Sequence, residues 1–194
     1  MISHQYKFIF VHAGRTGGSS FERIAEISVT ADPRTQHMGN TDFPEKHREF
    51  QYYRDTYRRE FDTYFKFTIV RNPFDRLVSA WFWRTQVVRD TRPCTLKEFV
   101  LARPRSSTYA AKFCLPGYSL RESVTRFDYI GRFEDLPGPY EYVCNKLGMP
   151  PKPIPYTNQT PFDRYWDYYD RETLELVQNL YREDIEVFDY KFGQ

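Results

Sequence analysis

The fold is decided by residues 7–20, which read Lys7-Phe8-Ile9-Phe10-Val11-His12-Ala13-Gly14-Arg15-Thr16-Gly17-Gly18-Ser19-Ser20. This stretch begins with a short and nearly continuous apolar run, which is typical of a strand buried on both faces. The residues that follow are too rich in glycine for a helix or a strand, and apolar residues then recur at helical spacing at Phe21, Ile24 and Ala25. The stretch therefore predicts a strand, a tight loop and a helix.

The same order of elements is predicted again from residue 64 onward. Residues 64–70 form a second apolar run, and a helix follows, because Asn72 suits the N-cap, Pro73 the first helical position and Asp75 the first turn. The wide apolar face of this helix consists of Phe74, Leu77, Val78, Trp81, Phe82 and Thr85.

The rest of the chain continues the alternation of strands and helices. We expect helices over 47–61, 95–102, 134–147 and 171–182, with a third strand over 127–131 and a helix stop at Gly148. Such alternation predicts an α/β fold, with a mainly parallel central sheet and helices on both of its faces. Because no linker separates the elements, we expect one domain over residues 1–194.

Composition narrows the class of protein. The 194 residues are 40% hydrophobic and 19% aromatic, which excludes a disordered chain, and the net charge of +2 does not favour a nucleic-acid partner. No apolar run approaches the ~20 residues of a membrane span, and we expect no secretory leader. We expect a cytoplasmic protein, or a lumenal one if an anchoring segment has been removed. The cysteines are too widely spaced for a disulfide framework or a metal site, so we expect free thiols and no metal.

The glycine-rich loop after the first predicted strand has the composition of an anion site. Its glycines allow a tight turn and a close approach of backbone N–H groups to a ligand. Arg15 adds a fixed positive charge, and hydroxyl donors come from Thr16, Ser19 and Ser20. The alternative is a tight turn whose hydroxyls only cap the helix. The loop is not a Walker A motif, because no Lys precedes the Ser pair, so a magnesium–nucleotide site is poorly supported.

Two stretches resemble the donor-binding motifs of sulfotransferases. Residues 10–20 resemble the 5′-phosphosulfate loop of the carbohydrate type, usually F-x-H-x-P-K-T-G-G-T-S, and residues 67–80 resemble the 3′-phosphate motif V-R-N-P-x-D-R-x-x-S. Weaker landmarks lie at 130–136, 158–160 and 181–190. The resemblance implies a P-loop-like, three-layer α/β domain. It also implies the donor PAPS (3′-phosphoadenosine 5′-phosphosulfate), with PAP as product and no metal.

The resemblance assigns roles to residues in both motifs. The residues that would bind the 5′-phosphosulfate are Arg15, Thr16, Gly17, Gly18, Ser19 and Ser20. Arg71 and Ser79 match the pair that binds the 3′-phosphate, and Arg132 is a further candidate for the nucleotide. Alternatively, Arg71 pairs with a local carboxylate and Ser79 only packs. Arg15 stands where the family usually has Lys, so its expected catalytic role is electrostatic and not proton donation.

The acceptor hydroxyl needs a base, and a histidine is the usual supplier. The pair Lys46-His47 resembles a family position proposed for the base, so we favour His47, although a surface histidine is a competing interpretation. The next candidates are His37 and then a carboxylate such as Glu45 or Glu49. We expect His12 to hold the loop and His4 to be solvated.

The predicted function is sulfuryl transfer from PAPS to a hydroxyl of a carbohydrate or small-molecule acceptor. Residues 1–126 hold 21 basic and 13 acidic residues, whereas residues 127–194 hold 7 and 13, so positive charge is concentrated where a polyanionic donor would bind. Two other functions stay open. A P-loop kinase would need a loop Lys and an acidic magnesium ligand, and a non-catalytic module for anionic glycans would need only the basic surface.

Overall fold

The computed structural model describes residues 1–29, 47–89, 92, 94–102, 108–150, 153–154 and 164–194. Its centre is a four-stranded sheet in the order β1-β2-β3-β4. The strands are β1 (Ile2–Ser3), β2 (Phe8–Phe10), β3 (Phe65–Val70) and β4 (Tyr129–Arg132). Strands β2, β3 and β4 are parallel, with Phe10 opposite Phe67 and Phe67 opposite Tyr129. The mainly parallel sheet is confirmed, and β1 adds an antiparallel edge that the sequence did not indicate.

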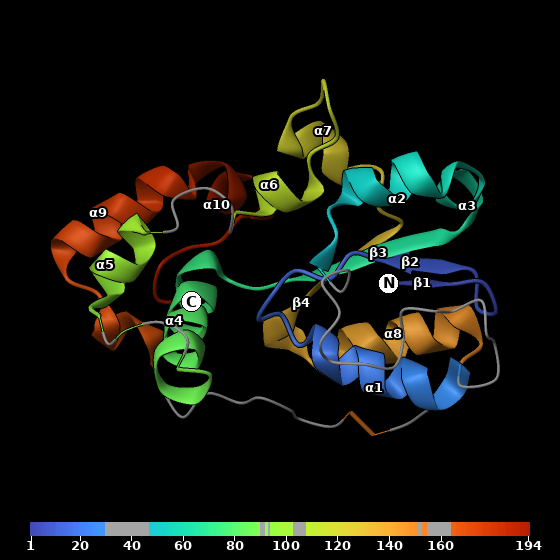
Figure 1. The fold of residues 1–194 in the computed structure, drawn as a ribbon, viewed down its shortest axis with the longest axis horizontal. Coiled ribbons are helices and arrows are strands. Elements are labelled where there is room, and N and C mark those ends of the chain that lie inside the picture. Colours follow the sequence, from blue (N-terminus) through green and yellow to red (C-terminus); the bar gives the residue numbers. More distant parts are fainter. Residues whose placement is uncertain (30–46, 90–91, 93, 103–107, 151–152, 155–163) are drawn as a thin grey trace.

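One face of the sheet is covered by two helices, α1 (Gly18–Val29) and α8 (Gly138–Leu147) (Figure 1). Phe8 and Phe10 of β2 are fully buried on this face, together with Phe67 of β3, and Phe21 of α1 packs on all three rings. Tyr140 of α8 stacks on Phe21, with ring centroids 5.2 Å apart. Because side chains alternate along a strand, Phe8 and Phe10 point to the same face of β2. They pack the first predicted strand against the helix that follows its loop.

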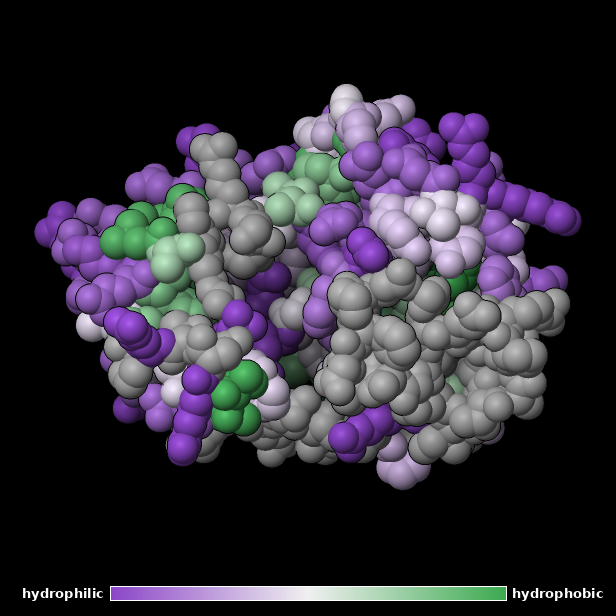
Figure 2. All heavy atoms as spheres, viewed as in Figure 1, coloured by the Kyte–Doolittle hydropathy of each residue, from purple (hydrophilic) through white to green (hydrophobic). Residues whose placement is uncertain are grey.

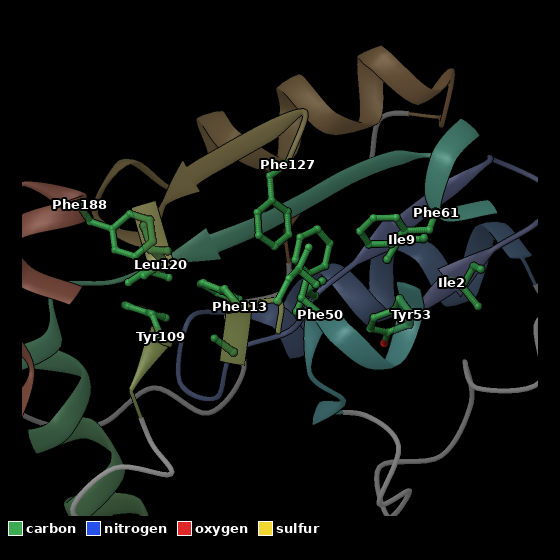
Figure 3. Packing of buried hydrophobic residues seen from close by; sticks show 14 of the residues in the cluster. Ile2, Ile9, Phe50, Tyr53, Phe61, Tyr109, Phe113, Leu120, Phe127 and Phe188 are labelled. Atoms are coloured by element: carbon green, nitrogen blue, oxygen red, sulfur yellow. The ribbon is translucent and has the colours of Figure 1, made fainter. Parts of the chain in front are cut away.

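The opposite face is covered by α2 (Phe50–Thr56), α3 (Arg58–Thr63), α6 (Tyr109–Phe113) and α7 (Leu120–Val124). Their core is a group of aromatic rings from distant parts of the chain, shown in Figure 3. Phe50 stacks on Phe127 with centroids 4.1 Å apart, and Phe113 meets Phe127 edge to face. The sheet thus lies between two helical layers, as the α/β interpretation predicts.

A third group of helices lies beside the sheet and has an apolar cluster of its own (Figure 1). It comprises α4 (Pro73–Phe82), the π-helix η2 (Trp83–Val87), α5 (Leu96–Leu101), η4 (Tyr165–Tyr168), α9 (Arg171–Leu180) and α10 (Arg182–Phe188). Helix α4 begins as predicted, because the Asn72 side chain accepts a hydrogen bond from the Phe74 N–H at 3.1 Å. Within the described residues, no helix has the length and apolar character needed to cross a lipid bilayer.

Three predicted helix boundaries were wrong. The helix expected over 47–61 is two helices, because the backbone breaks at Tyr57 (φ −126°, ψ 54°), and the first of them begins only at Phe50. The helix expected over 134–147 begins at Gly138, after the 3₁₀ turn η3 (Phe133–Asp135) and the Leu136-Pro137 bond. The last predicted helix breaks at Tyr181. Gly148 ends α8 in the left-handed region, as expected.

Candidate functional site

The glycine-rich loop connects the carboxyl end of β2 to the start of α1, beside the carboxyl end of β3. Ligands of open parallel sheets bind at this end of the strands. Two loop residues, Arg15 (φ 66°) and Gly17 (φ 78°), adopt the left-handed conformation. At Gly17 a side chain would also crowd Leu136 and Phe133, so a glycine is needed there.

His12 packs against the buried side of the loop. It is only 3% exposed, and its Nδ1 lies 2.9 Å from a carboxylate oxygen of Glu22 on α1. A Cβ atom on Gly18 would overlap the His12 ring, so the ring occupies the space that a side chain at 18 would need. These contacts agree with the expectation that His12 holds the loop.

Replacement of Gly18 by Ala should therefore disturb the loop. We expect Gly18→Ala to lower the free energy of unfolding by about 1–3 kcal/mol, because the added methyl must displace a buried ring. Urea denaturation followed by circular dichroism measures the change. Gly14→Ala is the matched control, since a Cβ there has no heavy atom within 4 Å and should change stability by less than about 0.5 kcal/mol. Equal stability of the two variants would contradict the packing role of Gly18.

Arg15 extends from the loop to α4 and η2. Its Nε donates a hydrogen bond to the Ser79 hydroxyl at 3.0 Å, and its guanidinium lies 4.7 Å from the ring centroid of Trp83. Burial, and after it the nearby charge of Arg71, lowers the pKa of Arg15 to about 10. The surroundings therefore oppose this charge, and a bound anion would relieve that opposition.

Arg71 directly follows β3 and contacts the same loop. Its Nη1 donates to the Arg15 carbonyl oxygen at 3.1 Å, while Nε and Nη2 donate to the two carboxylate oxygens of Asp75 at 2.7 and 2.9 Å. Its guanidinium also lies 4.1 Å from the ring centroid of Phe133. Arg71 is thus paired with a local carboxylate, as one of the two interpretations expected. The pair with Asp75 leaves Arg71 in contact with the loop.

The other residues that were predicted to bind the PAPS donor have different surroundings. Thr16 is fully buried, and its hydroxyl donates to the Ala13 carbonyl oxygen at 2.8 Å, so it braces the loop. Ser20 is buried and Ser19 half-buried in the first turn of α1. Arg132 instead contacts the C-terminal segment, where its Nη2 donates to the Phe188 carbonyl oxygen at 2.5 Å. The structure therefore joins Arg15, Arg71 and Ser79 in one group, whereas Arg132 lies against α10.

The exposed residue His47 lies next to this loop. Its ring centroid is 4.6 Å from that of His12, and its Nδ1 is 3.3 Å from the His12 carbonyl oxygen. A carbonyl oxygen only accepts hydrogen bonds, so this contact puts the proton on Nδ1 and the lone pair of the neutral ring on Nε2. That tautomer can accept a proton at Nε2. His37 and Glu45, the alternative bases, lie outside the described residues, and Glu49 is exposed.

Helix α6 connects Arg71 to His47, a connection that no sequence pattern indicated. At its start, the Tyr109 hydroxyl accepts from the Arg71 N–H at 2.7 Å and donates to the Arg71 carbonyl oxygen at 2.9 Å. Near its end, Lys112 donates from Nζ to the His47 carbonyl oxygen. Burial raises the pKa of Tyr109 to about 12, so its hydroxyl keeps the proton that it donates.

Asp184 of α10 fixes the start of α6. Its carboxylate accepts from the backbone N–H groups of Tyr109 at 2.6 Å and Ala110 at 3.1 Å, and Arg76 Nη2 lies 3.9 Å away. Only 1% of Asp184 is exposed, and this burial raises its pKa to about 6. Arg76 of the second motif therefore pairs with a carboxylate from the far end of the chain.

The raised pKa of Asp184 predicts a pH dependence of stability. Because the folded value of about 6 exceeds the unfolded value of 3.8, the protonated form favours folding, and this contribution is lost as the pH rises from about 4 to 6. Relative to Asp184→Asn, which does not titrate, the wild-type free energy of unfolding should fall by up to about 3 kcal/mol across this range. Chemical denaturation of both proteins at several pH values measures the difference. Parallel profiles would contradict the prediction.

One face of the molecule is hollowed. Figure 2 shows this hollow in the middle of the face, with hydrophilic side chains along it, where Figure 1 places the loop after β2 opposite α4. Among the described residues, no group of three His, Cys, Asp or Glu side chains could hold a metal ion. The site thus offers the half-buried guanidinium of Arg15, the buried guanidinium of Arg71 and the N-terminus of a twelve-residue helix, which together suit a multiply charged anion. The nearby imidazole of His47 can act as a proton acceptor.

A family model described as the sulfotransferase family matches residues 1–191, which is nearly the whole chain. Comparison with curated proteins finds no match, and neither does comparison with solved structures. The family match includes both motifs that supply the arginine group.

Proposed function

Since the chain belongs to the sulfotransferase family, we propose that it transfers a sulfuryl group from PAPS to a hydroxyl of a carbohydrate acceptor. The observation that carries this proposal is the meeting of two motifs that lie 56 residues apart. Arg71 donates to the backbone of Arg15, and Arg15 donates to Ser79, so both phosphate motifs contribute to one positively charged site.

The residues present fit a donor with two anionic ends. The loop N–H groups, Arg15 and the hydroxyls of Ser19 and Ser20 would hold the 5′-phosphosulfate. Arg71 would hold the 3′-phosphate, because Asp75 and the Arg15 carbonyl use three of its five N–H donors and leave two. Ser79, which matches the same phosphate pair, would join it through the hydroxyl that also accepts from Arg15. When bound, PAPS supplies an activated sulfuryl group and a good leaving group.

Each catalytic residue has one task in this proposal. Arg15 stabilises the negative charge that develops on the bridging oxygen, and it cannot donate a proton, because a guanidinium stays protonated. His47 accepts the proton of the acceptor hydroxyl at Nε2, while the His12 carbonyl oxygen holds Nδ1–H. The support for a carbohydrate is the likeness of residues 10–20 to the carbohydrate-type loop.

Two measurements test the proposal. Calorimetry should show binding of PAP and no binding of ATP with magnesium. Mass spectrometry of an acceptor library incubated with PAPS should then show products heavier by one sulfuryl group. Binding of ATP with magnesium but not PAP would indicate a kinase instead. Binding of anionic glycans that falls steeply with salt, without PAP binding, would indicate a non-catalytic module.

A further inference from the structure

We propose that Trp83 is a positioning residue, which orients the Arg15 guanidinium for the donor. This inference rests on the proposed function, because it takes the Arg15 site to be the donor site. Neither the glycine-rich loop nor the start of α4 at Asn72 requires an aromatic residue at position 83. Its role follows from where the structure places its ring.

Arg15 is held by two residues one helical turn apart. Ser79 in α4 accepts from Nε at 3.0 Å, and Trp83, four residues later, places its ring 4.7 Å from the guanidinium carbon. Residues at i and i+4 lie on the same face of a helix. One contact fixes Nε of the planar group and the other holds its central carbon over the Trp83 ring, so the guanidinium has little freedom to rotate.

The backbone at Trp83 supports this placement. The Trp83 N–H bonds to the carbonyl oxygens of both Ser79 and Ala80, and the Trp83 carbonyl accepts from Val88 N–H at 2.9 Å, five residues on. The helix therefore widens into a π-helix at the residue that contacts Arg15. Such π-helical turns occur often at functional sites.

The orientation matters because this loop carries Arg where related loops carry Lys. An ammonium group is a compact charge that donates in several directions, whereas a guanidinium donates only in its plane. With Nε bonded to Ser79, the directions in which the two Nη groups can donate are confined to that plane. The ring of Trp83 sets the tilt of the plane and so the direction in which these groups donate. A lysine at this position would not need the restraint.

Trp81 is the natural comparison, since it lies on the same helix. Its indole Nε1 donates to the Cys94 carbonyl oxygen at 2.9 Å, and its ring meets Tyr168 at 5.5 Å. It therefore serves packing among the helices beside the sheet. Trp81→Phe should lower stability and leave the kcat and the Kd for PAP within about twofold of the wild type.

A double-mutant cycle tests the role of Trp83. We expect Trp83→Leu to lower kcat and to weaken PAP binding about tenfold when residue 15 is Arg, and to change both less than about twofold in the Arg15→Lys variant. Trp83→Phe should recover most of the loss, because it restores an aromatic face. Equal losses in the wild-type and Arg15→Lys backgrounds, or no loss in Trp83→Leu, would overturn the proposal.

A measurement without donor separates this inference from the proposed function. In NMR spectra of the protein alone, the Arg15 Nε–H signal, assigned through Arg15→Lys, should be shifted by the Trp83 ring current and lose that shift in Trp83→Leu. An unchanged signal would overturn the positioning role. If the wild type fails to bind PAP although the ring-current shift is present, the proposed function fails and the Arg15–Trp83 contact stands.

Discussion

Arg15→Gln is expected to lower kcat by about 10²–10³-fold, which is the usual loss when one group that stabilises transition-state charge is removed. The side chain lies in the glycine-rich loop, and its charge is half-buried beside a second arginine. Gln keeps a polar side chain but cannot neutralise a leaving group. The loss should appear mainly in kcat, measured from PAP formation under saturating PAPS, because Arg71 and the loop N–H groups, which would bind the donor, stay in place.

The thermal stability of Arg15→Gln should not fall along with its kcat. Burial and the charge of Arg71 both disfavour the Arg15 cation, so its removal should leave the thermal midpoint unchanged or raise it. Arg23→Gln is the matched control, since it removes the same charge from an exposed position on the helix after the loop. Full activity of Arg15→Gln, or an equal loss in the control, would show that Arg15 does not stabilise the reacting charge.

His47→Ala is expected to reduce kcat by about 10²–10⁴-fold, the usual contribution of a general base. The KM for PAPS should change little, because the substitution leaves Arg71 and the loop N–H groups, which would bind the donor, in place. A general base acts only in its deprotonated form, so in the wild type kcat should fall at acid pH, where the His47 ring is protonated. The variant should lose this acidic limb of the profile.

His4→Ala serves as the matched control, since His4 contacts Tyr64 and Tyr57. It should keep both the rate and the pH profile. If His47→Ala retains full activity, or keeps the acidic limb with a lower rate, the base must be another group. Lys112→Met is a second variant to compare with His47→Ala, because it removes the contact to the His47 carbonyl oxygen and leaves the His47 ring unchanged.

The elements that the sequence predicted well are those set by local chemistry. The Asn72 cap and Pro73 start α4, and Gly148 ends α8, because each acts through its own backbone neighbours. The errors arose where packing overrode periodicity. The aromatic spacing from Phe50 to Phe61 fits one helix, yet the chain turns at Tyr57 so that both helices can pack on the same face of the sheet.

The site divides in the same way. The anion loop and Arg71 could be proposed from residues close together in the chain. The contacts that hold them could not, because Tyr109 reaches Arg71 across 38 residues and Asp184 reaches Tyr109 across 75. Tyr109 belongs to no motif, and Asp184 lies in the weaker landmark at 181–190, which does not indicate its partner.

The hydrogen bonds between Asp184 and α6 also have a consequence for when the site is completed during synthesis of the chain. The loop, β3 and α4 leave the ribosome early, but the carboxylate that caps α6 lies in α10, the last helix of the chain. Until that helix is made, the backbone N–H groups of Tyr109 and Ala110 lack their carboxylate acceptor, so the helix that contacts both Arg71 and His47 lacks one of its tertiary contacts. A nascent chain that already contains every residue of the anion loop therefore still lacks a finished site.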